Sequence, residues 1–252
     1  GGQILAMVVS SLVITFRLKD VHISFRHFRP DWKIIKDIYV VGIPSIVMQS
    51  IGTVMTMALN GILSSFSTAA YTVFGLYFKL QSFVFMPVFG LNQGLLPILG
   101  YNYGARNKHR MVSAFRSGCI IALCIMTAGM LVFLLVPQWL LGIFNASAEL
   151  LEIGIPALRI ICTCFLFAAL GIVCSTLFQA VGRGIYSLIV SLMRQLVVLV
   201  PAAWILAQVT HQVGAVWWSF PIAECVSLVV SLFFFLRLYN KEIKHLETVK
   251  ER

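Results

Sequence analysis

The amino-acid sequence predicts an all-α polytopic membrane protein. Apolar residues make up 60% of the 252 positions and charged residues only 11%, whereas about a quarter of the residues in a soluble domain are charged. Apolar stretches recur at the length of about 20 residues that a helix needs to cross a bilayer, and most basic residues lie between them. The formal net charge of +10 therefore indicates membrane topology, and we expect no nucleic-acid partner.

The first apolar stretch, residues 1–16, is shorter than a complete span. It has neither an initiator methionine nor a basic segment before its apolar residues, so we do not expect it to be a signal peptide. We interpret it as the end of a truncated transmembrane helix and expect the chain to be a fragment of a longer protein.

Six further apolar stretches are long enough to cross a membrane. Prolines and glycines recur inside them, which membrane helices tolerate better than soluble ones, so we expect kinks. The six cysteines also lie inside these stretches, where they are typical of small buried apolar side chains rather than of disulfides or metal ligands. The expected spans are 38–59, 71–91, 112–136, 153–178, 186–208 and 213–238.

Connections with and without basic residues alternate along the chain. The basic ones are 17–37, 106–110, the turn at Arg183 and the tail 239–252, and those without Lys or Arg are 60–70, 137–152 and 210–214. Because connections rich in Lys and Arg stay in the cytoplasm, we expect a cytoplasmic linker at 17–37, a six-helix lobe at 38–238 and a cytoplasmic tail at 239–252. Within the linker, Pro30 and Asp31 are typical of a helix start, with Asp31 as the N-cap.

The sequence has no signature of a soluble enzyme or of a divalent-metal site, so we expect no catalytic residue, metal ion or cofactor. Ionisable residues inside spans are the first candidates for a function, because burying a charge is unfavourable. Glu224 is the one acid inside a complete span. Burial can raise a carboxyl pKa towards the working pH, which favours coupling of Glu224 to H⁺ or Na⁺. The alternative is that Glu224 neutralises Lys79 or Arg194.

Basic and uncharged polar residues extend this candidate pathway for substrate or ion. Lys79 lies near the middle of its expected span, where it should face a polar cavity or pair with an acid. Arg159 and Arg194 lie nearer the membrane faces, where long side chains can reach water. Methionine and phenylalanine could add an adaptable apolar surface, although they more often face lipid or pack helices. The uncharged candidates are Gln49, Thr53, Gln81, Asn92, Gln93 and Gln179.

The most specific stretch of the sequence is GLNQGLLPILGYNYGA, from Gly90 to Ala105. Together with Gly42-Ile43-Pro44-Ser45, Phe178-Gln179-Ala180-Val181-Gly182-Arg183 and Pro221-Ile222-Ala223-Glu224, it resembles the C-terminal half of a transporter of the MATE (multidrug and toxic compound extrusion) family. The resemblance covers almost the whole chain. It implies the six-helix C-terminal lobe of a twelve-helix transporter, with 1–16 as the end of the sixth helix and 17–37 as the connection between lobes.

The same resemblance implies a function. A MATE transporter is a secondary antiporter of the bacterial inner membrane that exports cationic or amphipathic drugs in exchange for Na⁺ or H⁺, by alternating access between its lobes. We therefore expect organic substrates, membrane lipid and an N-terminal lobe outside this chain as partners. Some MATE branches place a cation-binding Glu in the first helix of this lobe, but 38–59 contains no acid, so the coupling site stays open.

Two other functions remain alternatives. One is a lipid-linked oligosaccharide flippase of the related superfamily, which would need a large cationic cavity, and Lys79, Arg159 and Arg194 could contribute to one. The other is a membrane scaffold subunit that transports nothing.

Overall fold

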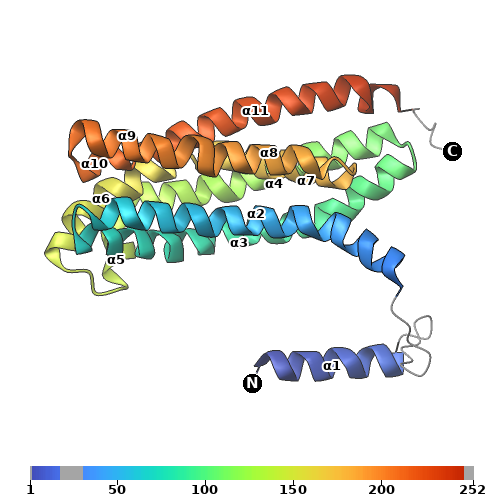
Figure 1. Ribbon diagram of the computed structural model, residues 1–252, viewed down its shortest axis with the longest axis horizontal. Helices are drawn as coiled ribbons and strands as arrows, with labels where there is room; N and C mark the ends of the chain where they lie inside the picture. Colours follow the sequence, from blue (N-terminus) through green and yellow to red (C-terminus); the bar gives the residue numbers. More distant parts are fainter. Residues whose placement is uncertain (1, 18–30, 247–252) are drawn as a thin grey trace. The chain divides into compact units, whose positions relative to one another are not determined.

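The computed structural model of the protein describes residues 2–17 and 31–246, apart from the side chains of 13–17 and of several residues between 37 and 49, Gln49 among them. Every regular element in this part of the chain is a helix, which confirms the all-α prediction (Figure 1). The chain divides into two units, residues 1–42 and 43–252, which are described separately.

The first unit contains helix α1, Gly2–Arg17, and the start of helix α2, Trp32–Ser64. The Oδ1 atom of Asp31 accepts a hydrogen bond from the backbone N–H of Lys33 at 2.8 Å, so the predicted N-cap is confirmed. Of the other residues in the predicted linker 17–37, Arg17 ends α1 and 32–37 begin α2, whereas 18–30, Pro30 among them, lie outside the described residues, as do 247–252 of the tail.

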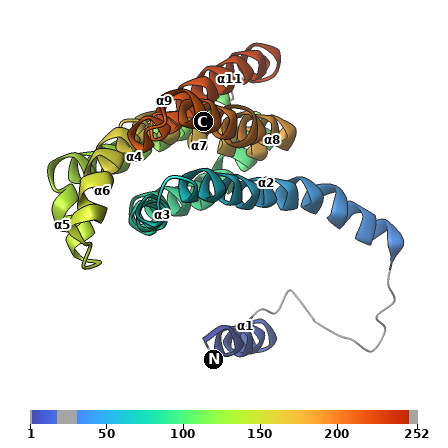
Figure 2. The same ribbon diagram turned by 60° about the vertical axis from the view of Figure 1, so that its left-hand side comes forward.

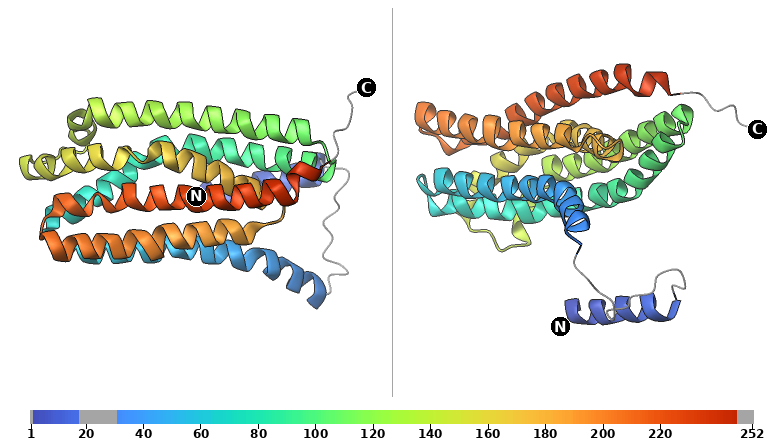
Figure 3. Two further views of the ribbon diagram at one scale, coloured as in Figure 1. Left: turned by 90° about the horizontal axis from the view of Figure 1, so that it is seen from above. Right: turned by 45° about the vertical axis from the view of Figure 1, so that its right-hand side comes forward.

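In the second unit, the long helices run side by side as a bundle (Figure 3). Helix α7 contacts α3, α4, α8 and α11 and is therefore the central helix of this unit (Figure 2). The elements after α2 are α3 (Thr68–Gly104), α4 (Lys108–Leu135), α5 (Pro137–Gly142), α6 (Ala148–Cys162), α7 (Phe165–Ala180), α8 (Gly184–Leu192), the π-helix η1 (Met193–Leu199), α9 (Val200–Thr210), α10 (Val213–Val216), α11 (Ser219–Lys241) and the short 3₁₀ helix η2 (Ile243–His245).

By length and composition, four described helical segments could each cross a membrane: Thr68–Gly104, Lys108–Leu135, Gly184–Thr210 and Val213–His245. The bent pair α6 and α7 gives a fifth if it is one span. Helix α2 covers the predicted span 38–59, and its part Ser50–Ser64 is an apolar helix of 15 residues. Helix α3 is longer than the predicted span 71–91, because it continues through Pro97 and almost the whole Gly90–Ala105 stretch. It also contains Pro87.

The predicted span 153–178 is not one straight helix. It is broken between α6 and α7, whose axes differ by 49°. At the break, the Thr163 hydroxyl donates to the Ile160 carbonyl at 2.7 Å and the Cys164 thiol to the Ile161 carbonyl at 2.9 Å. These side chains compete with backbone N–H groups for the same carbonyls, which favours a bend.

Short polar side chains cap the starts of α3 and α4. Ser67 accepts a hydrogen bond from the backbone of Ala70 at 3.0 Å, and Asn107 accepts one from Arg110 at 3.1 Å. Each side chain satisfies a backbone N–H at a helix start. The α7 helix ends at Ala180, and Gly182, two residues later, has a φ of +75°, a conformation that glycine adopts without strain.

Close contact between α3 and α4 depends on glycine. A Cβ atom added at Gly118 would lie 2.6 Å from the Cδ2 atom of Leu95, and one at Gly129 would collide with Val84. Glycine therefore lets the two backbones approach, as small residues do in membrane helices. On the same two helices, Phe85 of α3 and Phe133 of α4 each pack their rings edge-on against Phe165 of α7, at 5.3 Å between centroids.

Candidate functional site

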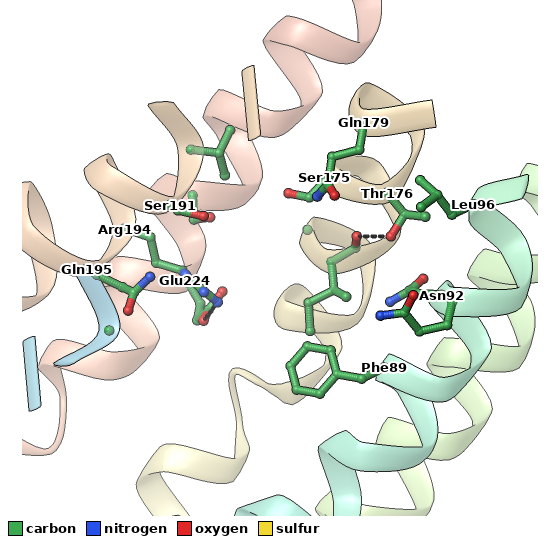
Figure 4. A pocket seen from close by; sticks show the side chains of 16 residues that line it. Phe89, Asn92, Leu96, Ser175, Thr176, Gln179, Ser191, Arg194, Gln195 and Glu224 are labelled. Atoms are coloured by element: carbon green, nitrogen blue, oxygen red, sulfur yellow. Dashed lines mark hydrogen bonds and ion pairs between the residues drawn. The ribbon is translucent and has the colours of Figure 1, made fainter. Parts of the chain in front are cut away.

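The bundle of the second unit contains a polar cavity of about 680 Å³. Its wall is built from α2, α3, α7, α8, η1 and α11, so that segments far apart in the sequence face one another across it (Figure 4). The lining residues are Gly52, Phe89, Asn92, Gln93, Leu96, Gly171, Ile172, Ser175, Thr176, Gln179, Val190, Ser191, Arg194, Gln195, Glu224 and Ser227.

One wall of the cavity holds an ion pair. The Nη1 atom of Arg194 on η1 donates to the Oε1 atom of Glu224 on α11 at 2.9 Å. The two side chains are only 28% and 15% exposed. This partly buried pair depends on both partners, because removing one leaves an uncompensated charge.

Arg194 lies on an irregular helical turn. Residues 193–199 form the π-helix η1 between α8 and α9, and single π turns inside α-helices occur often at functional sites. The wider turn shifts the side chains on either side of it around the helix axis. Ser191, Arg194 and Gln195, which are spaced by three and four residues, all line the cavity.

The opposite wall is formed by α3 and α7 (Figure 4). Asn92 is 8% exposed, and within the described residues neither atom of its carboxamide has a hydrogen-bond partner. Nearby, the hydroxyl of Thr176 donates to the carbonyl of Ile172 at 3.1 Å. The wall therefore contains one amide group that is buried behind its surface and has no hydrogen-bond partner among the described residues.

Five of the nine predicted site residues line this cavity: Asn92, Gln93, Gln179, Arg194 and Glu224. The structure also decides between the two partners considered for Glu224, since its carboxylate pairs with Arg194 and not with Lys79.

Four predicted residues do not line the cavity. Lys79 is exposed on α3, and its Nζ lies 5.8 Å from the ring centroid of Phe144. The prediction placed it at mid-span, whereas the longer α3 puts it nearer the start of the helix. Thr53 is exposed on α2, Gln81 lies roughly three turns before Asn92, and the side chain of Gln49 is outside the described part.

Sequence reasoning missed the hydroxyl residues of α7. Gly171, Ser175 and Gln179 are four residues apart and line the cavity together with Ile172 and Thr176. Positions spaced by three and four share a helix face, so this spacing was the signal that could have identified them.

The family model MatE matches residues 44–205, which is more than half of the chain. The chain belongs to the MatE family. The cavity and its ion pair therefore belong to a multi-pass membrane protein of the MatE fold.

Curated relatives include export proteins. Multidrug export protein MepA of Staphylococcus haemolyticus (strain JCSC1435) is 25% identical over 231 residues, which cover 91% of this chain and 50% of the relative. MepA of Staphylococcus saprophyticus subsp. saprophyticus (strain ATCC 15305 / DSM 20229 / NCIMB 8711 / NCTC 7292 / S-41) is 27% identical over 244 residues, covering 95% and 53%. This MatE chain thus spans about half the length of the curated relatives it matches.

Solved structures agree with the family assignment. The outward-facing conformation of a multidrug resistance MATE family transporter of the MOP superfamily matches with a TM-score of 0.82 and 28% identity, over 95% of this chain and 55% of that one. The inward-facing conformation of such a transporter matches with a TM-score of 0.78 and 28% identity, over 95% and 57%. This MatE chain therefore has the fold of about half a transporter.

Proposed function

We propose that this MatE chain is one lobe of a secondary antiporter that exports cationic or amphipathic organic compounds in exchange for Na⁺ or H⁺. The main support is a polar cavity with an ion pair largely shielded from water, in a chain similar to multidrug export proteins. Alternating access would require a second lobe against this one, and we propose the bacterial inner membrane as its location, with residues 17–37 and the C-terminus in the cytoplasm.

Within this proposal, Glu224 couples export to the ion. Binding of H⁺ or Na⁺ at its carboxylate would weaken the contact with Arg194, and the freed guanidinium would change the charge that a substrate meets in the cavity. Substrate and ion would then bind in turn at Arg194 and Glu224. No further cofactor enters this proposal.

Replacing Glu224 by Gln tests the proposal. In cells that express the complete gene, Glu224→Gln should abolish ion-driven efflux of ethidium while the protein is still present in the membrane. Glu149→Gln, at an exposed acid on α6 outside the cavity, is the matched control and should leave efflux unchanged. A proton ionophore and a sodium-free buffer identify the ion. Unaltered efflux by Glu224→Gln would rule out its coupling role.

The flippase alternative receives less support from the cavity. A pyrophosphate group would need several cations, whereas Arg194 is the one basic residue among the lining residues and Glu224 neutralises it. Lys79 and Arg159 are both exposed and line no part of this cavity. A scaffold subunit would have no need for a polar cavity lined by a partly buried ion pair.

A further inference from the structure

A second, smaller recess lies between α4 and α11, near one end of both helices. Both helices pack against α7, and Leu177 of α7 forms part of the recess wall. The recess has a volume of about 40 Å³, is open to the surface and exposes only apolar atoms. Across it, the rings of Phe115 on α4 and Phe235 on α11 stack at 5.3 Å between centroids.

The ends of the two helices place cations beside this recess. The Nζ atom of Lys108 lies 5.7 Å from the ring centroid of Tyr239, a lining residue, and donates to the backbone carbonyl of Lys244 at 3.2 Å. Lys108 precedes the lining residue Val112 by four positions, so it lies one turn further along the same face of α4. Lys244 is exposed and directly follows Ile243, which also lines the recess. One end of an apolar recess is therefore cationic.

The charges of these two lysines are not neutralised by the part of the chain that the structure describes. The one hydrogen bond of the Lys108 ammonium goes to a neutral carbonyl, which leaves two of its three donors for another group. Among the described residues, no acid pairs with Lys108 or Lys244. Glu242, two residues before Lys244, accepts from Arg183 and Tyr103 instead. An anionic group can therefore bind here.

An apolar recess with cations at one end fits one class of ligand in a membrane. The segments Lys108–Leu135 and Val213–His245 are both long and apolar enough to cross it, so their common end lies where lipid headgroups meet acyl chains. Part of an acyl chain can fill the recess while the headgroup phosphate accepts from Lys108. Basic pockets between transmembrane helices recognise anionic headgroups in this way. A water-soluble anion would leave the apolar wall uncovered.

We propose that this recess binds an anionic phospholipid, with its headgroup on Lys108 and Lys244 and part of one acyl chain between α4 and α11. An anionic headgroup is preferred to a zwitterionic one, because the cationic group of a zwitterionic headgroup is repelled by the same lysines. This inference goes beyond the export function proposed above and does not rest on it.

Two phospholipids with the same acyl chains test this preference. The complete protein, purified in detergent, is mixed with equal amounts of phosphatidylglycerol and phosphatidylcholine at a low ratio of lipid to protein. Native mass spectrometry then measures which lipid is bound first. We expect phosphatidylglycerol to be retained on the order of tenfold more often, as two lysines near a headgroup would produce.

Variants of the lysines assign the preference to this end of the recess. Lys108→Gln combined with Lys244→Gln should reduce the preference to about twofold or less, because both charges are removed. Lys79→Gln is the matched control and should keep the preference. Lys79 is also an exposed lysine whose Nζ lies near an aromatic ring, at 5.8 Å from the centroid of Phe144, and it lies outside the recess.

Val112→Phe tests the apolar part of the site independently of charge. The larger side chain should fill the recess and lower the retention of both lipids about fourfold, through loss of buried acyl surface. Val112 is 40% exposed, so the ring has room without disturbing the core.

Three outcomes would overturn the anionic preference at this site. They are equal retention of the two lipids, a preference that the double lysine variant keeps, and an equal loss of preference in Lys79→Gln. Retention that Val112→Phe leaves unchanged would overturn the recess as the place of binding. Because lipid retention is measured without transport, each of these outcomes leaves the proposed export function standing.

Discussion

At the scale of single residues, Glu242 joins three parts of the bundle. Its Oε1 atom accepts hydrogen bonds from Nε and Nη2 of Arg183 at 2.9 and 2.6 Å, and its Oε2 atom accepts one from the hydroxyl of Tyr103 at 2.7 Å. Glu242 follows α11, Tyr103 lies at the end of α3, and Arg183 lies between α7 and α8. One carboxylate therefore ties the ends of these helices together.

Glu242→Gln should lower the thermal midpoint of the purified protein by a few degrees. The amide keeps the size of the side chain but loses the charge, and its one remaining oxygen cannot serve both partners as strongly. The effect stays modest because Arg183 is 52% exposed. Glu152→Gln, at an exposed acid on α6, is the control, and an equal midpoint for the two variants would contradict this role of Glu242.

The pH dependence of this contact follows from Arg183. Hydrogen bonding to Glu242 raises the pKa of Arg183 above its usual value. The contribution of a group with a raised pKa is complete below its unfolded-state pKa and is lost as the pH rises through the folded-state pKa. Because both values lie in strongly alkaline solution, a thermal-denaturation series between pH 6 and 10 should show no loss of this contact through titration of Arg183.

The cavity residues show which parts of the candidate site could be predicted from the sequence alone. Glu224 and Arg194 could be singled out because charges inside apolar stretches are rare. Their pairing could not be deduced, because it depends on how η1 and α11 pack. Lys79 satisfied the same rule but lies outside the cavity. The expected span ended at 91, whereas α3 continues to Gly104, so Lys79 is not in the middle of its helix.

At the scale of helices, the seam between α3 and α4 depends on Gly118. Gly118→Ala should destabilise the protein by about 1–3 kcal/mol, because the added methyl group overlaps Leu95. Leu95→Ala removes the overlap but also removes buried apolar atoms, so the double variant should lose less stability than the sum of the two single losses. Thermal or denaturant unfolding of the purified single and double variants measures both effects.

Gly75→Ala serves as the control for this seam. A Cβ atom at Gly75, also in a long helix, would meet no atom within 4 Å, so the change should be neutral or slightly stabilising. If Gly118→Ala behaved like Gly75→Ala, the seam would not depend on the missing side chain.

Helices themselves were predictable, and their irregularities were not. Hydropathy identifies a membrane helix by its length and composition, which located α3, α4 and the segment of α10 and α11 within a few residues except for the far end of α3. The break at Thr163 and Cys164 involves no proline. It depends on side-chain hydrogen bonds to Ile160 and Ile161 that many serines, threonines and cysteines in the chain could equally have formed.

At the scale of the whole molecule, the positive-inside pattern predicts an orientation that fusions can test. Alkaline phosphatase joined within 60–70 should be active, because this connection would lie outside the cytoplasm. The same enzyme joined after residue 240 should be inactive, whereas a fluorescent protein at that position should fluoresce. The opposite pattern, measured in cells at equal expression, would invert the proposed topology.

The π-helix η1 also has a genetic consequence. A π turn accommodates one residue more than the α-helix around it, so loss of one codon within 193–199 would leave a continuous α-helix rather than a broken one. The residues on one side of the deletion would turn by about 100° relative to the other side. Such an in-frame deletion would preserve the helix while rotating the residues on one side of it relative to those on the other, and under the proposed export function the variant should be present in the membrane but fail to export ethidium.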